Sequence, residues 1–351
     1  MILSYDTAEA FALKRNPVLS FPFLKENGEL LRIAVDSGCI LDPRALALYG
    51  DFYKSALKLT ELYPPYFRFI LGMIIDLEKG GMQGDVSKTL AQHILDEGFV
   101  LLDLSDTRKL ETLSMLEQVI PLSEPLTEMR YGIIRNVDHL ISYPDTYTKL
   151  NKPLFYELTH IVFFLTDYGK RSPPLNAELA ACLTNMGLLC LLDNDADLLA
   201  EICTCLAYIG APIPEYWDSF LQKNLQEVQI SYHGTVSSSL NSAVDEYHIY
   251  FVLNWYAAVR ERPLFQTRFQ GKAPSFSLPV MPQSILSKLS DVSHQFHFSR
   301  NNVVRDLSSF VASLNDQELL HWKNVLKSSS MSQNLIEKFS ELDSGTSLDL
   351  R

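Results

Sequence analysis

One segment of the sequence gathers two acids and a histidine at spacings that a helix would place on one face. Residues 155–169 read Phe-Tyr-Glu-Leu-Thr-His-Ile-Val-Phe-Phe-Leu-Thr-Asp-Tyr-Gly and contain Glu157, His160 and Asp167. Positions three, four and seven apart share a helical face. In an apolar pocket, desolvation moves the pKa of such groups towards neutrality, which suits general acid–base chemistry. We predict that His160 is the acid or base and that Glu157 or Asp167 orients it.

A second segment repeats the spacing of acid and histidine. Asp245 and His248 lie in residues 245–252, among Tyr247 and Tyr250. We predict that this pair completes the same site from another helix. For both pairs the alternative is structural, since a buried histidine and carboxylate that bond each other fix helix packing.

The same residues also suit a metal site. Helical di-iron carboxylate proteins use two helices with an acid three residues before a histidine, and one further Glu from each of two other helices. In this alternative the cofactor is a divalent metal (iron, zinc or manganese), and otherwise no cofactor is expected. The ligands would be His160, His248, Glu157 and Asp245, with Glu178 or Glu201 in addition.

Helical periodicity dominates the sequence around these segments. Helices are expected at residues 153–167, 176–192, 195–209, 214–229 and 239–260. The best candidate for a strand, residues 31–35, is short. The short turn between the second and third of these helices makes a helical hairpin. We predict an all-α fold of helical hairpins, arranged as an α/α toroid around an enclosed cavity.

Composition changes along the chain predict four parts. Residues 1–262 are expected to form the main helical domain. A proline-containing irregular connection or lid follows at 263–283, and C-terminal helices that pack on the main domain at 284–327. Residues 328–351 are rich in serine and are expected to form a partly disordered tail.

The overall composition limits the partners of the protein. The chain has 351 residues, of which 47% are hydrophobic, so it can bury a large core. Its net charge of −12 disfavours binding to phosphate backbones, so nucleic acid is not an expected partner. The sequence contains no run of about 18 uncharged apolar residues, so a membrane-spanning helix is not expected. Asp6 lies where a signal peptide carries positive charge, and five cysteines lack a disulfide-type spacing, so a cytoplasmic location is expected.

The first segment resembles the signature of a known family. Its motif Tyr156-Glu157-Leu158-Thr159-His160, with Phe163 and Thr166-Asp167-Tyr168-Gly169, is similar to the Thr-His…Phe…Thr-Asp-aromatic-Gly signature of an uncharacterised family of bacterial helical proteins. The second segment, Asp245-x-Tyr247-His248, resembles another signature of that family. Some members lie near specialised-metabolism genes, so the resemblance implies such a setting. The family carries no established activity.

These observations favour an enzyme that acts on a small, largely apolar metabolite by cyclisation, isomerisation or hydrolysis. A metal-dependent enzyme using the same residues is one alternative. A non-catalytic helical binding or scaffold protein, with a protein partner, is the other. An enzyme requires both acid–histidine pairs in one concave pocket, within about 10 Å of each other, whereas a scaffold would place them on opposite faces.

Overall fold

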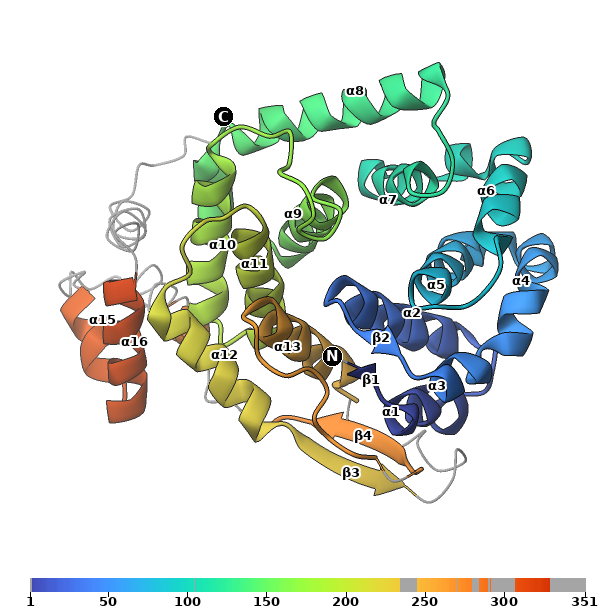
Figure 1. The fold of residues 1–351 in the computed structure, drawn as a ribbon. Helices are drawn as coiled ribbons and strands as arrows, with labels where there is room; N and C mark the ends of the chain where they lie inside the picture. Colours follow the sequence, from blue (N-terminus) through green and yellow to red (C-terminus); the bar gives the residue numbers. More distant parts are fainter. Residues whose placement is uncertain are drawn as a thin grey trace.

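Helices dominate the protein, as the sequence predicts (Figure 1). The computed structural model describes residues 2–103, 105–233, 245–269, 271–279, 284–289, 291 and 307–328. Within these ranges the strands form only two small two-stranded sheets, so the all-α prediction is confirmed. No helix in the described part of the chain is long and apolar enough to cross a membrane.

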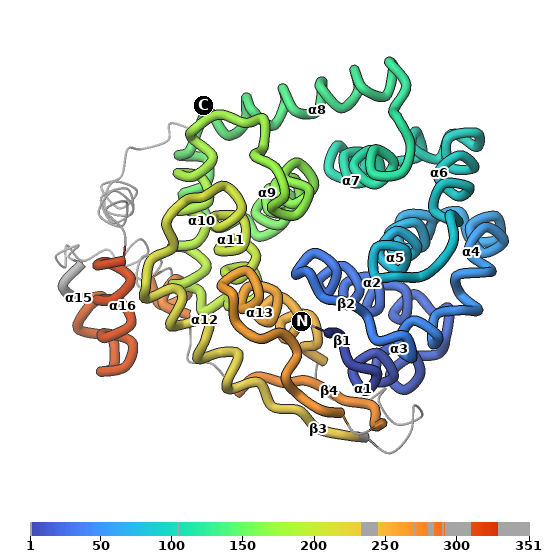
Figure 2. The backbone as a smooth tube through the Cα atoms, in the orientation of Figure 1, coloured from blue at the N-terminus to red at the C-terminus, as the bar shows by residue number. Residues whose placement is uncertain are grey.

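Six helices of the described residues contact one another in a ring. They are α2 (Phe21–Asp36), α5 (Phe67–Lys79), α7 (Asp106–Glu117), α9 (Lys152–Leu165), α11 (Ala196–Tyr208) and α13 (Tyr247–Val259). Each packs against the next, and α13 packs against α2, so the contacts return to their starting point. Figure 2 traces this path around the centre of the molecule. We call these six the ring helices.

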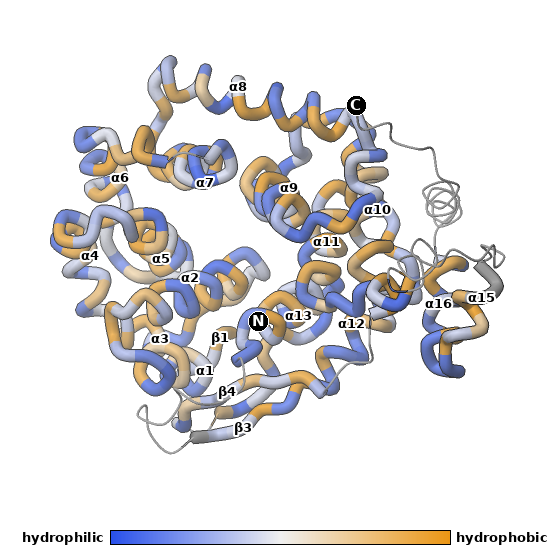
Figure 3. Tube along the Cα trace, turned by 180° about the vertical axis from the view of Figure 1, so that it is seen from behind, coloured by the Kyte–Doolittle hydropathy of each residue, from blue (hydrophilic) through white to orange (hydrophobic). Residues whose placement is uncertain are grey.

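A second set of helices lies outside the ring and alternates with it along the chain (Figure 1). It comprises α4 (Gly50–Leu62), α6 (Val86–Asp96), α8 (Glu124–Ile141), α10 (Leu179–Leu192) and α12 (Glu215–Glu227). Each of the five packs on at least one ring helix. Polar and apolar positions alternate along α8 (Figure 3), which buries Ile133, Ile134 and Val137. One apolar face is therefore enough to hold an outer helix.

Shorter elements complete the described chain. The short helices are α1 (Tyr5–Glu9), a π-helix at Ala10–Arg15, α3 (Pro43–Leu48), 3-10 helices at Pro64–Tyr66, Phe99–Leu102 and Pro144–Thr148, and α15 (Leu307–Ser313). The last described helix is α16 (Asp316–Ser328).

Local sequence signals start several ring helices. The side chains of Ser20, Asn151 and Asp195 each accept a hydrogen bond from the backbone N–H three residues on, at the starts of α2, α9 and α11. Such caps satisfy N–H groups that have no partner inside the helix. Because these signals are local, the predicted helices at 153–167 and 195–209 lie close to the observed α9 and α11.

The strands differ from the sequence prediction. The candidate strand at residues 31–35 is not a strand, because these residues continue α2, whose buried Leu30, Leu31, Ile33 and Ala34 follow helical spacing. The observed strands are β1 (Ile2–Leu3), parallel to β2 (Ile40–Leu41), and β3 (Gln229–His233), antiparallel to β4 (Ala273–Ser277). β4 lies inside the segment predicted to be irregular.

The C-terminal helix α16 packs on the outer helices α10 and α12. His321 Nε2 lies 2.8 Å from the carbonyl oxygen of Leu191, and Trp217 Nε1 donates a hydrogen bond to Ser328 Oγ at 3.0 Å. The predicted tail after residue 328 lies outside the described residues, as does much of the segment between 280 and 306. The division into four parts therefore stays a prediction.

Gly187 in α10 supports the contact between α10 and α12. A Cβ atom at this position would overlap the ring of the fully buried Trp217. We predict that Gly187→Ala lowers the free energy of unfolding by about 1–3 kcal/mol, as overpacking of a core does.

The matched control is Gly132→Ala in α8, where the nearest atom, at the end of Arg135, lies 3.9 Å away. That change should stabilise by about 0.5–1 kcal/mol, since alanine favours helix. Urea unfolding measures both, and a Gly187→Ala variant as stable as the control would contradict this packing.

Candidate functional site

A cavity of about 460 Å³ lies between the ring helices. Residues from all six of them line it, namely from α2, α5, α7, α9, α11 and α13. Its volume falls within the roughly 300–1,000 Å³ typical of small-molecule sites. The centre of the ring is therefore the candidate site.

The lining combines charges with aromatic rings. Its basic side chains are Lys25, Arg32, Arg68 and Arg108, and its acidic ones are Glu29, Asp76, Glu111, Glu157 and Glu201. Its aromatic side chains are Phe69, Phe163, Phe164, Tyr168, Phe251 and Trp255. The rings of Phe163 and Trp255 pack with their centroids 4.6 Å apart. The cavity thus offers an apolar surface beside fixed charges.

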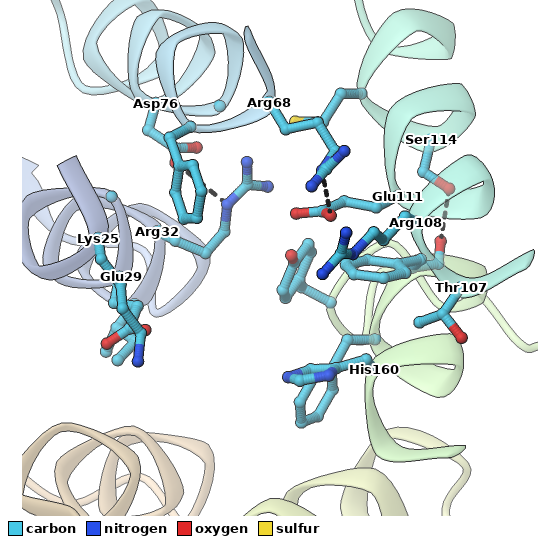
Figure 4. A pocket seen from close by; sticks show the side chains of 18 of the residues that line it. Lys25, Glu29, Arg32, Arg68, Asp76, Thr107, Arg108, Glu111, Ser114 and His160 are labelled. Carbon is cyan, nitrogen blue, oxygen red and sulfur yellow. Dashed lines mark hydrogen bonds and ion pairs between the residues drawn. The ribbon is translucent and has the colours of Figure 1, made fainter. Parts of the chain in front are cut away.

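Three of the predicted site residues line this cavity. They are Glu157, His160 and His248. The His160 side chain is half-buried and lines the cavity (Figure 4). Its ring packs nearly parallel to that of Phe164, with centroids 6.2 Å apart. Its two nitrogens make no hydrogen bond to any described residue. Glu157, on the same helix, is exposed to solvent.

The other two predicted residues lie outside the cavity lining. Asp245 precedes α13, where it accepts hydrogen bonds from Arg15 Nη2 at 2.8 Å and from the Phe276 N–H at 3.1 Å. It therefore joins β4 to the N-terminal segment. Asp167 follows the end of α9 with a φ of 46°, and its ion pair is with Lys170, 3.9 Å away. Because α9 ends at Leu165, Asp167 does not continue the face that carries His160.

His248 pairs with acids of α11 instead of Asp245. Its Nδ1 lies 2.8 Å from Asp197 Oδ1, and its Nε2 lies 3.9 Å from Glu201 Oε1. Asp197 and Glu201 are four residues apart in α11, so they share one helical face. The imidazole of His248 is therefore held between two carboxylates.

Two hydroxyl groups of α9 hold these acids in place. Tyr156 donates a hydrogen bond to Asp197 Oδ2 at 2.5 Å, and Thr159 donates one to Glu201 Oε2 at 2.7 Å. The sequence prediction missed Tyr156, Thr159 and Asp197. Two acids four residues apart in the otherwise apolar α11 were the available signal, and Glu201 entered only as an additional metal ligand.

The two histidines differ in protonation. Burial lowers the pKa of His248, but the hydrogen bond and charge of Asp197, together with Glu29 and Glu201, outweigh it and raise that pKa to about 9. Burial raises the pKa of Glu201 to about 7, although the charge of His248 opposes this. Burial lowers the pKa of His160 below its ordinary value of 6.5. At neutral pH the cavity thus holds an imidazolium and a neutral imidazole.

The described part of the chain has no cluster of ligands of the kind that the predicted metal site requires. Within it, no group of three or more His, Cys, Asp or Glu side chains is arranged to hold a metal ion. Of the predicted ligands, Asp245 is bound by Arg15. The five cysteines are free and buried.

Comparison with known proteins assigns the chain to a family. The family model described as a domain of unknown function (DUF6902) matches residues 5–342, so the chain belongs to that family. No curated protein and no solved structure gives a significant match. This finding confirms the prediction, made from the resemblance of the first segment, that the chain belongs to a family without an assigned activity. The signature motif of that family stays a prediction.

The pairing of His248 with Asp197 makes stability depend on pH. The pKa of His248 rises from 6.5 in the unfolded chain to about 9 in the folded protein. The stabilisation is therefore complete below about pH 6.5 and is lost as the pH rises through about 9. A rise of this pKa from 6.5 to about 9 corresponds to about 3 kcal/mol, and solvent screening at a side chain that is 32% exposed reduces this to about 1 kcal/mol. We predict that between these pH values the Tm of the wild type falls by roughly 2–4 °C more than that of His248→Gln, which is the shift expected for about 1 kcal/mol.

Thermal melts across this pH range test the prediction. The Tm of Asp197→Asn should change with pH as that of His248→Gln does. The matched control, His139→Gln, changes an exposed histidine of α8 outside the cavity and should follow the wild type. Parallel pH profiles for the wild type and His248→Gln would contradict the prediction.

Proposed function

We propose that the protein is an enzyme that acts on a small, largely apolar metabolite, with the cavity between the ring helices as its active site. The observation that carries this proposal is that one cavity holds two histidines in different surroundings, His248 between two carboxylates and His160 among aromatic rings. Environments that push the pKa values of two groups apart are typical of an acid and a base that work together. We also propose that the ring and outer helices form an α/α toroid.

The two histidines have different roles in this proposal. His160 is the general base, because it is neutral and its nitrogens are not bonded to the described protein. His248 is the general acid, or stabilises negative charge that develops on the substrate, because Asp197 keeps it protonated. Cyclisation, isomerisation and hydrolysis all need one group to take a proton and another to give or hold one.

Asp197, Tyr156, Thr159 and Glu201 are positioning residues. Asp197 bonds the Nδ1 of His248 and so leaves the Nε2 side of the ring for Glu201 or for a ligand. Glu201 is fully buried and lies at the cavity wall, with its other oxygen bonded to Thr159. With a pKa of about 7 it can exchange a proton with His248.

The aromatic side chains support a substrate with an apolar body. Phe163, Phe164 and Trp255 line the cavity and form an apolar surface of mutually tilted rings next to His160. Flat rings bind well against such surfaces, in stacked or edge-on arrangements. The reacting atom would then lie between this surface and the two histidines.

Conversion of a small-molecule extract tests this proposal. Purified protein is incubated with an extract of the cells that make it, and loss of a compound with gain of a product is followed by mass spectrometry. We predict turnover by the wild type and a loss of about 10²–10⁴-fold in His160→Ala and His248→Ala, the usual contribution of an acid or base. The exposed control His139→Ala should keep full activity.

Thermal melts accompany each variant. His160→Ala should keep the fold, because His160 makes no hydrogen bond to the described residues. Wild-type turnover by His160→Ala would contradict the proposed base. A compound that binds without being converted would favour the alternative of a binding protein.

A further inference from the structure

Three arginines from three consecutive ring helices face one part of the cavity. Figure 4 shows the side chains of Arg32, Arg68 and Arg108 directed towards one another around the carboxylate of Glu111. They come from α2, α5 and α7. The reaction proposed above, with two histidines, does not use any of them.

Arg68 is fully engaged by acids. It makes ion pairs with Asp103 and, through Nε at 3.2 Å, with Glu111. Its charge is therefore balanced inside the protein. Arg68 forms part of the wall and fixes Glu111.

Arg32 keeps a donor without a partner. Its Nε lies 3.1 Å from Asp76, and its guanidinium carbon lies 4.7 Å from the centre of the Tyr168 ring. These contacts hold the group in place at a side-chain exposure of 12%. Its Nη1 is buried and has no hydrogen-bond partner among the described residues. A buried N–H group without a partner costs free energy, so a ligand oxygen at this position would recover it.

Arg108, unlike Arg32, has a whole guanidinium group that no described residue binds. Its side chain is exposed, lines the cavity, and makes no ion pair or hydrogen bond with the described residues. Thr107, next to it in α7, lines the cavity as well and carries a hydroxyl group that can donate a hydrogen bond. Arg32 on α2 and Arg108 on α7 thus provide unused guanidinium donors to one cavity, from the two ring helices that pack on either side of α5.

We propose that Arg32 and Arg108, with the hydroxyl of Thr107, bind an anionic group of the ligand, a carboxylate or a phosphate, whose apolar body lies against Phe163 and Phe164 near His160. This inference rests on the proposed function for the identity of the site, and it names the substrate as an anion with an apolar body. Guanidinium groups suit both anions because their N–H donors match pairs of anion oxygens.

The acids of the cavity are compatible with this assignment. Glu29 lies 3.9 Å from Lys25, and Asp76 is held by Arg32. Glu111 is the acid closest to the three arginines in Figure 4. Burial raises the pKa of Glu111, although the charge of Arg68 opposes this. Its carboxylate is paired with Arg68 at 3.2 Å, so its charge is balanced by a group that the proposed anion does not use.

Four probes that share a phenyl ring test the inference by isothermal titration calorimetry. They are phenylacetate, phenyl phosphate, 2-phenylethanol and phenethylamine. We expect at least one anionic probe to bind about 10-fold or more tightly than the alcohol and the amine, because a charged hydrogen bond to arginine distinguishes them. The tighter of the two anions identifies the group as carboxylate or phosphate.

Arginine variants locate the binding site. Arg108→Ala should lower the affinity for the tighter-binding anion about 10-fold or more and leave the affinity for the alcohol unchanged. Arg108→Lys should recover part of the lost affinity. Since Arg108 is exposed and unpaired with described residues, this variant should keep the fold; Arg32→Gln is the second variant, checked by thermal melting. Arg44→Ala is the control, because Arg44 is 75% exposed and pairs with Asp42 outside the cavity lining. Equal affinities of the four probes, no binding of either anion, or unchanged affinity in Arg108→Ala would overturn the inference.

This experiment separates the inference from the proposed function. Binding of the probes needs no turnover, so it can be measured whether or not the protein converts a substrate. Anion binding that depends on Arg108, in a protein without histidine-dependent turnover, would contradict the enzyme proposal alone. Turnover whose KM is unchanged by Arg108→Ala would contradict the anion site alone.

Discussion

Polar contacts between neighbouring ring helices are the constraint on which the structure depends. A charged group directed into the centre of a helical ring loses water and must find a partner on the next helix or in a ligand. The contacts follow the ring from α2 to α13 and back: Arg32–Asp76, Arg68–Glu111, Ser114–Phe164, Tyr156–Asp197, His248–Asp197, and Lys25 over the ring of Tyr247. Apolar packing on the outer helices brings the ring helices together, while these contacts fix how the side chains of each face the cavity.

The chemistry that we propose depends on cavity side chains that differ in the partners they have. His248 lies between two acids and is protonated, whereas His160 lies among aromatic rings and is neutral. The buried Nη1 of Arg32 has no hydrogen-bond partner among the described residues, and the exposed Arg108 side chain makes no ion pair with them. A cavity with an acid, a base, free cationic donors and an apolar wall has the groups to bind and convert an anion with an apolar body.

The sequence predicts the parts of this structure that local rules decide. Periodicity and capping place α9 and α11, and the helical spacing of an acid and a histidine in two apolar segments points to His160 and His248. The partner of His248 could not be predicted in this way, because Asp197 lies 51 residues away in sequence and Asp245 has the better local spacing. Arg32 lay in the segment that was the best candidate for a strand, and its direction into the cavity depends on the closure of the ring. Asp167 was assigned to the site because the exact end of α9 is not a local signal.

The most direct test of the account is an NMR titration of the two imidazoles in protein labelled at histidine. We expect the signal lost in His248→Gln to titrate near pH 9, and the signal lost in His160→Ala to titrate below 6.5. Because the charge of His248 lowers the pKa of His160, His248→Gln should raise the pKa of His160. Two histidines that both titrate near 6.5, with His160 unaffected by His248→Gln, would contradict the claim that one cavity holds an acid and a base.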